Sequence, residues 1–414
     1  MTVLHERLPM RLLHTSDWHL GQHFLGKSRQ AEHQALIDWL VAQTEAQGID
    51  AVLIAGDIFD TGTPPSYASE LYNQLVERLH DAKVTLLLLG GNHDSVAVLG
   101  ESRSLLARLG TIVVPCAESP ATQVHCLKRR DGHPGVLVCA VPFIRPRDVL
   151  VSQAGQSADE KQGALLEAIR QHYAAAYAAA LAQRDTLNKP LPIVLTGHLT
   201  TVGATASESV REIYVGALEA FPSNAFPPAD YIALGHIHRP QQVGGQAHIR
   251  YSGSPLALSF DECGQQKEML LVEFDAQGQA SATPLPVPDF QPMATVTCTL
   301  AQAPAALAAA AARGTDERPV WLEVTIREDD YLSDLPARVQ ALCDGLPVEA
   351  LRIRRARDKR ESALVAAPLE TLDELGPAAV FARRLALEEI DEARQQALQE
   401  RFRQTLANMT EDGA

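Results

Sequence analysis

The chain has 414 residues, of which 46% are hydrophobic and 21% are charged, as expected for a globular protein of two or three domains. Its net charge of −15 argues against a protein that grips nucleic acid through its overall field, although bound cations and local basic patches can reverse the sign where it matters. No apolar run reaches the roughly 18 residues of a membrane span, and residues 1–9 contain no apolar signal core, so we expect a cytoplasmic protein with no membrane association.

The first part of the chain alternates predicted strands and helices. Apolar runs predict buried strands at residues 10–16, 51–55 and 84–89. Helical spacing predicts helices at residues 28–47, 64–79 and 102–109. Strand-like sequence then dominates at residues 112–114, 123–127 and 136–141. Alternation followed by strand-rich sequence predicts an α/β fold with two stacked sheets flanked by helices.

The remainder of the chain predicts two further units separated by proline-rich segments. A long alanine-rich helix at residues 159–184 precedes strands at residues 193–196, 231–234, 249–252 and 268–274. The proline-rich residues 284–292 predict a linker. We therefore expect a first domain at residues 10–283, a small α+β unit at 293–360 and, after a second linker, a final helix at 377–409 with an apolar stripe.

Five predicted strands end in a short polar cluster that contains Asp, Asn or His. The clusters are Asp17-Trp18-His19, Gly56-Asp57-Ile58-Phe59-Asp60, Gly90-Gly91-Asn92-His93-Asp94, Gly197-His198 and Gly235-His236-Ile237-His238. Any one of them has a simple structural explanation, because Asn, Asp and Gly form turns. Open α/β sheets, however, bind ligands at the carboxyl ends of their strands. Five such clusters together predict one site.

These side chains are suitable ligands for two divalent cations. An oxygen and nitrogen set without thiolate favours Mn²⁺ or similar ions, and the six cysteines show no C-x-x-C spacing. We expect Asp57 to bridge the two ions, with three ligands on each side. The ligands are Asp17, His19 and His238 for one ion, and Asn92, His198 and His236 for the other.

A metal pair about 3.5–4 Å apart activates water and clamps a phosphoryl group for in-line displacement. In such a site His93 is best interpreted as a residue that binds no metal. It would stabilise the transition state or protonate the leaving oxygen.

The order of the motifs resembles a known family. Asp-x-His, Gly-Asp-x-x-Asp, Gly-Asn-His-Asp, Gly-His and Gly-His-x-His resemble the calcineurin-like metallophosphoesterase superfamily. Residues 14–21 (HTSDWHLG) and 142–147 (PFIRPR) resemble its branch of double-strand-break repair nucleases. The resemblance covers essentially the whole chain after residue 9. It implies a four-layer α/β/β/α sandwich, an α+β capping domain and a C-terminal helix, with Asp60 orienting His93 as part of the catalytic machinery.

The resemblance also implies a function. It is that of a Mn-dependent DNA nuclease, an exonuclease on double strands and an endonuclease on single strands and hairpins, acting in DNA recombination and repair at the nucleoid. The partner would be an SMC-like ATPase bound through the C-terminal helix, with the chain a homodimer within a heterotetramer.

Two other functions stay open. A phosphomonoesterase or cyclic-nucleotide phosphodiesterase could use the same scaffold, although the cap and the terminal helix count against it. A clamp that binds DNA ends without cutting would have no need of His93.

Three weaker signals have a structural and a functional interpretation. Residues 21–28 match a P-loop pattern, but Asp17 and His19 separate it from its strand, which disfavours a nucleotide site. Basic residues at 352–360 form either a solvated face or a phosphate-binding patch; they are Arg352, Arg354, Arg355, Arg357, Lys359 and Arg360. For Arg145 and Arg147 the structural interpretation is favoured, because neighbouring prolines fix the turn.

Overall fold

The structure, a computed structural model, divides into two units. Residues up to Arg354 form the first and residues from Arg355 the second. It describes residues 9–150, 157–205, 220–275, 277–327, 334–356, 398, 401 and 402.

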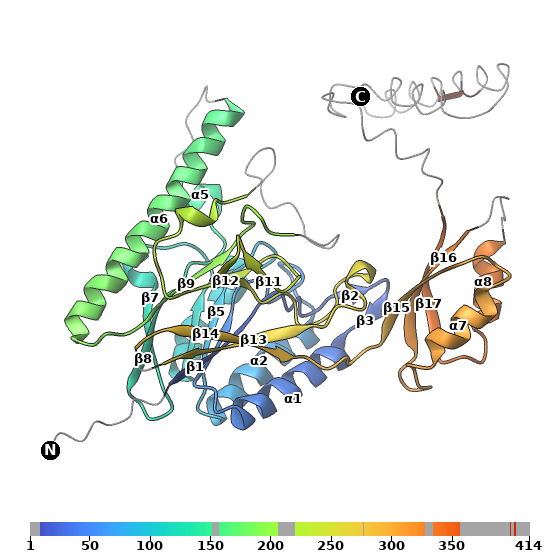
Figure 1. Cartoon of the computed structure of the whole chain (residues 1–414), viewed down its shortest axis with the longest axis horizontal. Coiled ribbons are helices and arrows are strands. Elements are labelled where there is room, and N and C mark those ends of the chain that lie inside the picture. Colours follow the sequence, from blue (N-terminus) through green and yellow to red (C-terminus); the bar gives the residue numbers. More distant parts are fainter. Residues whose placement is uncertain are drawn as a thin grey trace. The chain divides into compact units, whose positions relative to one another are not determined.

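The first unit contains two six-stranded sheets (Figure 1). The first sheet has the order β14-β13-β1-β4-β5-β6. Its strands are β1 (Met10–Thr15), β4 (Ala51–Ile54), β5 (Thr85–Leu89), β6 (Thr111–Val114), β13 (Glu268–Phe274) and β14 (Ala280–Pro286). The strands β1, β4, β5 and β6 are parallel, so their carboxyl ends share one edge.

The second sheet has the order β11-β12-β10-β9-β8-β7. Its strands are β7 (Val124–Lys128), β8 (Pro134–Cys139), β9 (Ile193–His198), β10 (Tyr231–Gly235), β11 (Gln241–Val243) and β12 (Gln246–Tyr251). The strands β8, β9, β10 and β12 are parallel to their neighbours in this sheet. Both sheets therefore present a set of parallel strand ends on which a site can be built.

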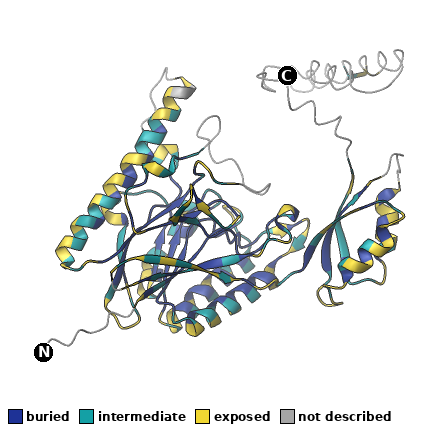
Figure 2. Ribbon diagram, viewed as in Figure 1, coloured by how far each residue is buried: buried dark blue, intermediate teal, exposed yellow. Residues whose placement is uncertain are grey.

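Helices cover the outer face of each sheet. The longer ones are α1 (Gln30–Ala46), α2 (Ser66–Asp81) and α6 (Ala158–Leu187). The strand β4 shows how the layers arise: Val52 and Ile54 join the core under α1 and α2, while Ala51 and Leu53 join the core between the sheets. The second sheet packs against α6 in a third core. The four-layer α/β/β/α arrangement expected from the resemblance is confirmed, and Figure 2 shows burial concentrated in the sheets and on the inner helix faces.

Short elements connect these layers. They are β2 (His23–Phe24), β3 (Lys27–Ser28), α3 (Val96–Gly100), α4 (Arg103–Arg108), α5 (Pro146–Val149) and the 3₁₀ turns η1 (Pro120–Gln123), η2 (Ser223–Ala225) and η3 (Phe260–Glu262). No helix in the described residues is long and apolar enough to cross a membrane.

The expected α+β elements follow, with their own core. They are β15 (Met293–Cys298), α7 (Ala303–Ala311), β16 (Val320–Ile326), α8 (Leu335–Cys343) and β17 (Val348–Arg355). Aromatic packing connects this sheet to the first part of the chain, since Trp321 of β16 stacks on Phe24 at 5.7 Å between ring centroids.

The proline-rich segment is not wholly a linker. Strand β14 extends through Pro284 to Pro286, beyond the expected domain limit at residue 283. It is an edge strand, where a residue without an N–H is tolerated. Of the helix expected at 377–409, the structure describes Leu398, Arg401 and Phe402, all helical; the rest of it, like residues 357–360, lies outside the described residues.

Candidate active site

The ends of β1 and β4 present the first three functional side chains in an unusual backbone conformation. Asp17, His19 and Asp57 have φ values of 56°, 48° and 52°, in the left-handed region that side chains other than glycine rarely adopt. Crossed main-chain hydrogen bonds hold the two segments together, from Asp17 N to Gly56 O (3.0 Å) and from His19 N to Asp57 O (3.1 Å). Strained residues of this kind persist where the surrounding structure enforces them, often at functional sites.

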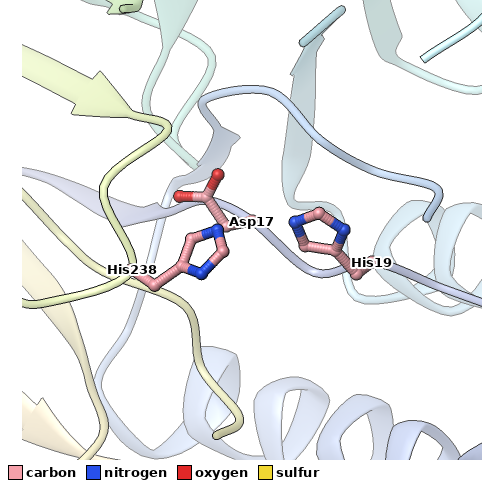
Figure 3. Close-up of side chains that lie close together, drawn as sticks. All are labelled: Asp17, His19 and His238. Carbon is pink, nitrogen blue, oxygen red and sulfur yellow. The ribbon is translucent and has the colours of Figure 1, made fainter. Parts of the chain in front are cut away.

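Asp17, His19 and His238 form the first group of potential ligands (Figure 3). They follow β1 and β10, and each offers a ligand atom within 4.8 Å of the other two. The Nδ1 of His19 donates to the Asp60 carboxylate (3.1 Å), so its Nε2 is left for the site. That Nε2 is buried and has no hydrogen-bond partner among the described residues.

Asp57, His198 and His236 form the second group, in which Asn92 also takes part. The Nδ1 of His198 donates to the carbonyl of Ala55 (2.9 Å). The Oδ1 of Asn92 lies 2.9 Å from Nε2 of His198 and 3.2 Å from Nδ1 of His236. The Nε2 of His236 is buried without a hydrogen-bond partner in the described parts of the chain.

Asp57 lies between the two groups. Its Oδ2 is 3.2 Å from Nε2 of His198 and 3.7 Å from Nε2 of His19. It is the acidic residue that contacts both sets, as a bridging ligand must. All seven residues predicted as ligands are thus brought together, which agrees with the prediction.

The charges of the site act strongly on one another. Burial alone would raise the pKa of Asp57, but the charges of His198 and His19 hold it well below its ordinary value. Burial opposes ionisation of His198 too, yet Asp57 raises the pKa of that imidazole to about 9. Burial and the neighbouring His198 lower the pKa of His236. Buried carboxylates beside imidazoles with unpartnered nitrogens fit divalent cations, which would supply the missing positive charge.

His93 and Asp60 lie beside this cluster. The main-chain N of His93 donates to Oδ1 of Asp57 (2.9 Å), and its Nδ1 donates to the carbonyl oxygen of Asp60 (2.7 Å). The carboxylate of Asp60 accepts from His19. Asp60 therefore contacts both histidines, and its effect on catalysis through His93 stays a prediction.

One residue of the site was missed as a functional residue. The buried carboxylate of Asp94 accepts hydrogen bonds from the main-chain N of Ile58 (3.1 Å), Phe59 (2.9 Å) and Gly91 (2.8 Å). It thereby ties the segment after Asp57 to the turn that carries Asn92 and His93. Its position in the Gly-Asn-His-Asp motif was the available signal. Burial, and then the charge of Asp57, raise the pKa of Asp94 to about 6.

The weaker sequence signals have structural explanations. Within the P-loop match, Lys27 belongs to the β2–β3 hairpin and pairs with Glu349 (2.5 Å). Arg145 donates to the carbonyl of Asp94 (3.1 Å), in line with its structural interpretation.

The basic run begins on one face of β17, as its alternation predicts. Arg352 and Arg354 both pair with Glu323 of β16, at 3.1 and 3.2 Å. Part of their charge is therefore balanced within the sheet.

Comparison with known proteins agrees with this geometry. Residues 10–240 match the family described as calcineurin-like phosphoesterase, and residues 289–389 match the one described as type 5 capsule protein repressor C-terminal domain. The chain is 53% identical over 397 residues to the D subunit of the nuclease SbcCD from Escherichia coli strain K12, covering 96% of this chain and 98% of that protein. It is 33% identical to the corresponding protein of Rhodobacter capsulatus, covering 90% and 94% of the two chains, and 29% identical to that of Bacillus subtilis, covering 84% and 83%.

Proposed function

Because this chain belongs to the calcineurin-like phosphoesterase family and, within it, to the D subunits of SbcCD nucleases, we propose that it is a Mn²⁺-dependent DNA nuclease with two metal ions. Membership of the family makes it a metal-dependent hydrolase of phosphodiester bonds. The finer activity that we propose is exonuclease action on double-stranded ends and endonuclease action on hairpins and single strands. The observation that carries the proposal is the convergence of five strand ends on two ligand groups with Asp57 between them.

The donor set supports the choice of metal. It consists of carboxylate, imidazole and amide groups, with no thiolate in the ligand groups of the described residues. Such sites suit Mn²⁺ better than structural zinc. Bound there, two divalent cations would supply Lewis acidity toward the phosphoryl oxygens and a water of lowered pKa.

The residues of the chain have separate tasks in this proposal. Asp17, His19 and His238 would hold one ion, and Asn92, His198 and His236 the other, with Asp57 shared. His93 is half-buried and its Nδ1 is fixed by the carbonyl of Asp60. Its remaining nitrogen would donate a proton to the leaving oxygen or stabilise the charge that develops on the phosphate.

We further propose that an SMC-like ATPase, SbcC, is the partner of this chain. The relatives are named as one subunit of a two-subunit nuclease, which supports a partnership. We assign the contact with the partner to the helix at 377–409, and we propose a homodimer within a heterotetramer at the nucleoid. Removing residues from 377 onward should abolish co-purification with the ATPase but preserve hydrolysis of small phosphodiesters.

Substrate choice tests the proposal. The full chain with Mn²⁺, with and without the ATPase, is given a blunt duplex, a hairpin, a single strand, bis-p-nitrophenyl phosphate, p-nitrophenyl phosphate and a cyclic nucleotide. We expect cleavage of all three DNAs and of the diester. Hydrolysis of p-nitrophenyl phosphate or the cyclic nucleotide with no cut in any DNA would replace the nuclease with a phosphomonoesterase or cyclic-nucleotide phosphodiesterase.

A further inference from the structure

A buried carboxylate stands behind one of the potential metal ligands. Glu262, at the end of η3, is 1% exposed. Its Oε1 accepts a hydrogen bond from Nδ1 of His238 (3.2 Å) and its Oε2 accepts one from the main-chain N of Leu258 (3.0 Å). The carboxylate can only accept, so Nδ1 of His238 carries the proton and its Nε2 is presented to the site.

A buried lysine fixes this carboxylate. Lys267 is 7% exposed, and its Nζ lies 2.6 Å from Oε2 of Glu262. The same ammonium group donates to the main-chain carbonyl of His238 (3.2 Å) and to Oγ of Ser254 (3.0 Å). The ion pair therefore touches both ends of His238, its ring and its backbone. The charges of Lys267 and His238 outweigh burial and lower the pKa of Glu262 far below its ordinary value.

The turn that carries Glu262 is itself held in place. Phe260 belongs to a buried cluster with Phe24, Met293 and Trp321, and the rings of Phe260 and Phe24 lie 5.0 Å apart. The guanidinium of Arg352 lies 5.7 Å from the Phe260 ring. Packing against β15, β16 and β17 thus limits the movement of η3.

Burying an ion pair is expensive and is weak evidence for stability alone. Metal-binding histidines, in contrast, commonly donate to a carboxylate that orients the ring and increases its basicity. Among the other histidines of the site, His198 and His93 donate to main-chain carbonyls, which are neutral.

We propose that Glu262, fixed by Lys267, is a positioning residue for His238 and sets the affinity of one of the two metal positions. This inference rests on the proposed two-metal site. Breaking the contact should weaken the ion held by Asp17, His19 and His238, and should leave the ion held by Asn92, His198 and His236 nearly unchanged.

The test is Mn²⁺ binding to the purified full chain, followed by isothermal titration calorimetry and independently by Mn²⁺ electron paramagnetic resonance. The variant Glu262→Gln keeps the shape and removes the charge. We expect about 10–100-fold weaker binding at one position and wild-type binding at the other. Hydrolysis of bis-p-nitrophenyl phosphate should then require more Mn²⁺ but approach the wild-type kcat at saturation.

The control is a second buried ion pair, Arg29 with Glu32, which are 1% and 8% exposed and 2.7 Å apart. Glu32→Gln should lower stability, followed by urea unfolding, without changing either metal affinity. If Glu262→Gln does not fold, Glu262→Asp keeps the charge on a shorter arm and should still weaken one position.

Wild-type affinity at both positions, or equal loss at both, would overturn the inference. The proposed nuclease can fail independently, because metal binding is measured without any DNA. A wild-type chain that binds two ions and cuts no substrate would end the proposed function and leave the comparison of the variants valid.

Discussion

A close approach of the backbone to Asp57 predicts a severe effect of a single methyl group at Gly91. A Cβ at this position would lie 2.1 Å from Oδ1 of Asp57 and 2.3 Å from its main-chain N. Atoms in contact prefer about 3.5 Å, so either Asp57 or the turn at Gly91 has to move by about 1 Å or more. Asp57 is the residue shared by both ligand groups, so the displacement would reach both metal positions.

The size of the effect follows from this displacement. Overpacking of this kind costs about 1–3 kcal/mol of stability, and a misplacement of about 1 Å can reduce the rate about 100-fold. We therefore expect Gly91→Ala to lower kcat/KM for bis-p-nitrophenyl phosphate with Mn²⁺ by about 100-fold, equivalent to roughly 2.7 kcal/mol. Affinity for Mn²⁺ should fall as well.

Two other glycines provide matched controls. A Cβ at Gly62 would meet Ser95 at an ordinary 3.6 Å, and one at Gly163, on α6, would meet nothing within 4 Å. Gly62→Ala and Gly163→Ala should keep activity within about threefold of wild type, since a contact at that distance is not repulsive. If Gly91→Ala folded and matched these controls in rate and in metal affinity, the packing of the turn against Asp57 would not matter and our reasoning would be refuted.

Three further predictions concern metal, acid and DNA. Mn²⁺ at 100 times its Kd should raise the free energy of unfolding by about 2.7 kcal/mol per site relative to the chelated protein; equal urea midpoints would contradict a site formed only in the folded chain. Burial lowers the pKa of His14 and of His33 to about 3, so protonation favours the unfolded chain: stability is intact above about pH 6.5 and falls toward pH 3, by about 1.4 kcal/mol per unit for each histidine. Urea unfolding at decreasing pH measures this slope, which His14→Gln should reduce by about one proton; an unchanged slope would contradict the assignment. Replacing Arg352 and Arg354 by Glu should weaken DNA binding and flatten its salt dependence, measured by fluorescence anisotropy, and unaltered binding would show that these residues serve only their pairing with Glu323.

The sequence predicted the ligand set because its signal is local. Each ligand lies within a few residues of an apolar strand, and parallel strands bring such ends to one edge. Asp57 was expected to be shared because it follows the second strand, and its contacts with His19 and His198 agree with this expectation. The two sheets and their helices could be predicted for the same reason, since buried parallel strands are continuous apolar runs.

The supporting residues could not be predicted, because their roles depend on contacts between distant segments. Glu262 is 24 residues from His238 in sequence, and no spacing rule connects them. Asp94 was visible within its motif, but its three main-chain donors appear only when the segment after β4 is folded beside it. Strand β14 was assigned to a linker because its prolines suggest one, whereas its pairing with β13 at the edge of the sheet decides its structure.

The central claim is metal-dependent cleavage of DNA by the groups around Asp57 and His93. The most direct test is cleavage of a labelled DNA hairpin with Mn²⁺, comparing wild type, His93→Ala and Asp57→Ala, each with and without the ATPase partner. We expect wild-type cleavage, loss of cleavage in both variants, and Mn²⁺ binding that is retained in His93→Ala but reduced in Asp57→Ala. Full cleavage by His93→Ala or by Asp57→Ala would contradict the roles assigned here, and hydrolysis of bis-p-nitrophenyl phosphate without any cut in DNA would contradict the nuclease itself.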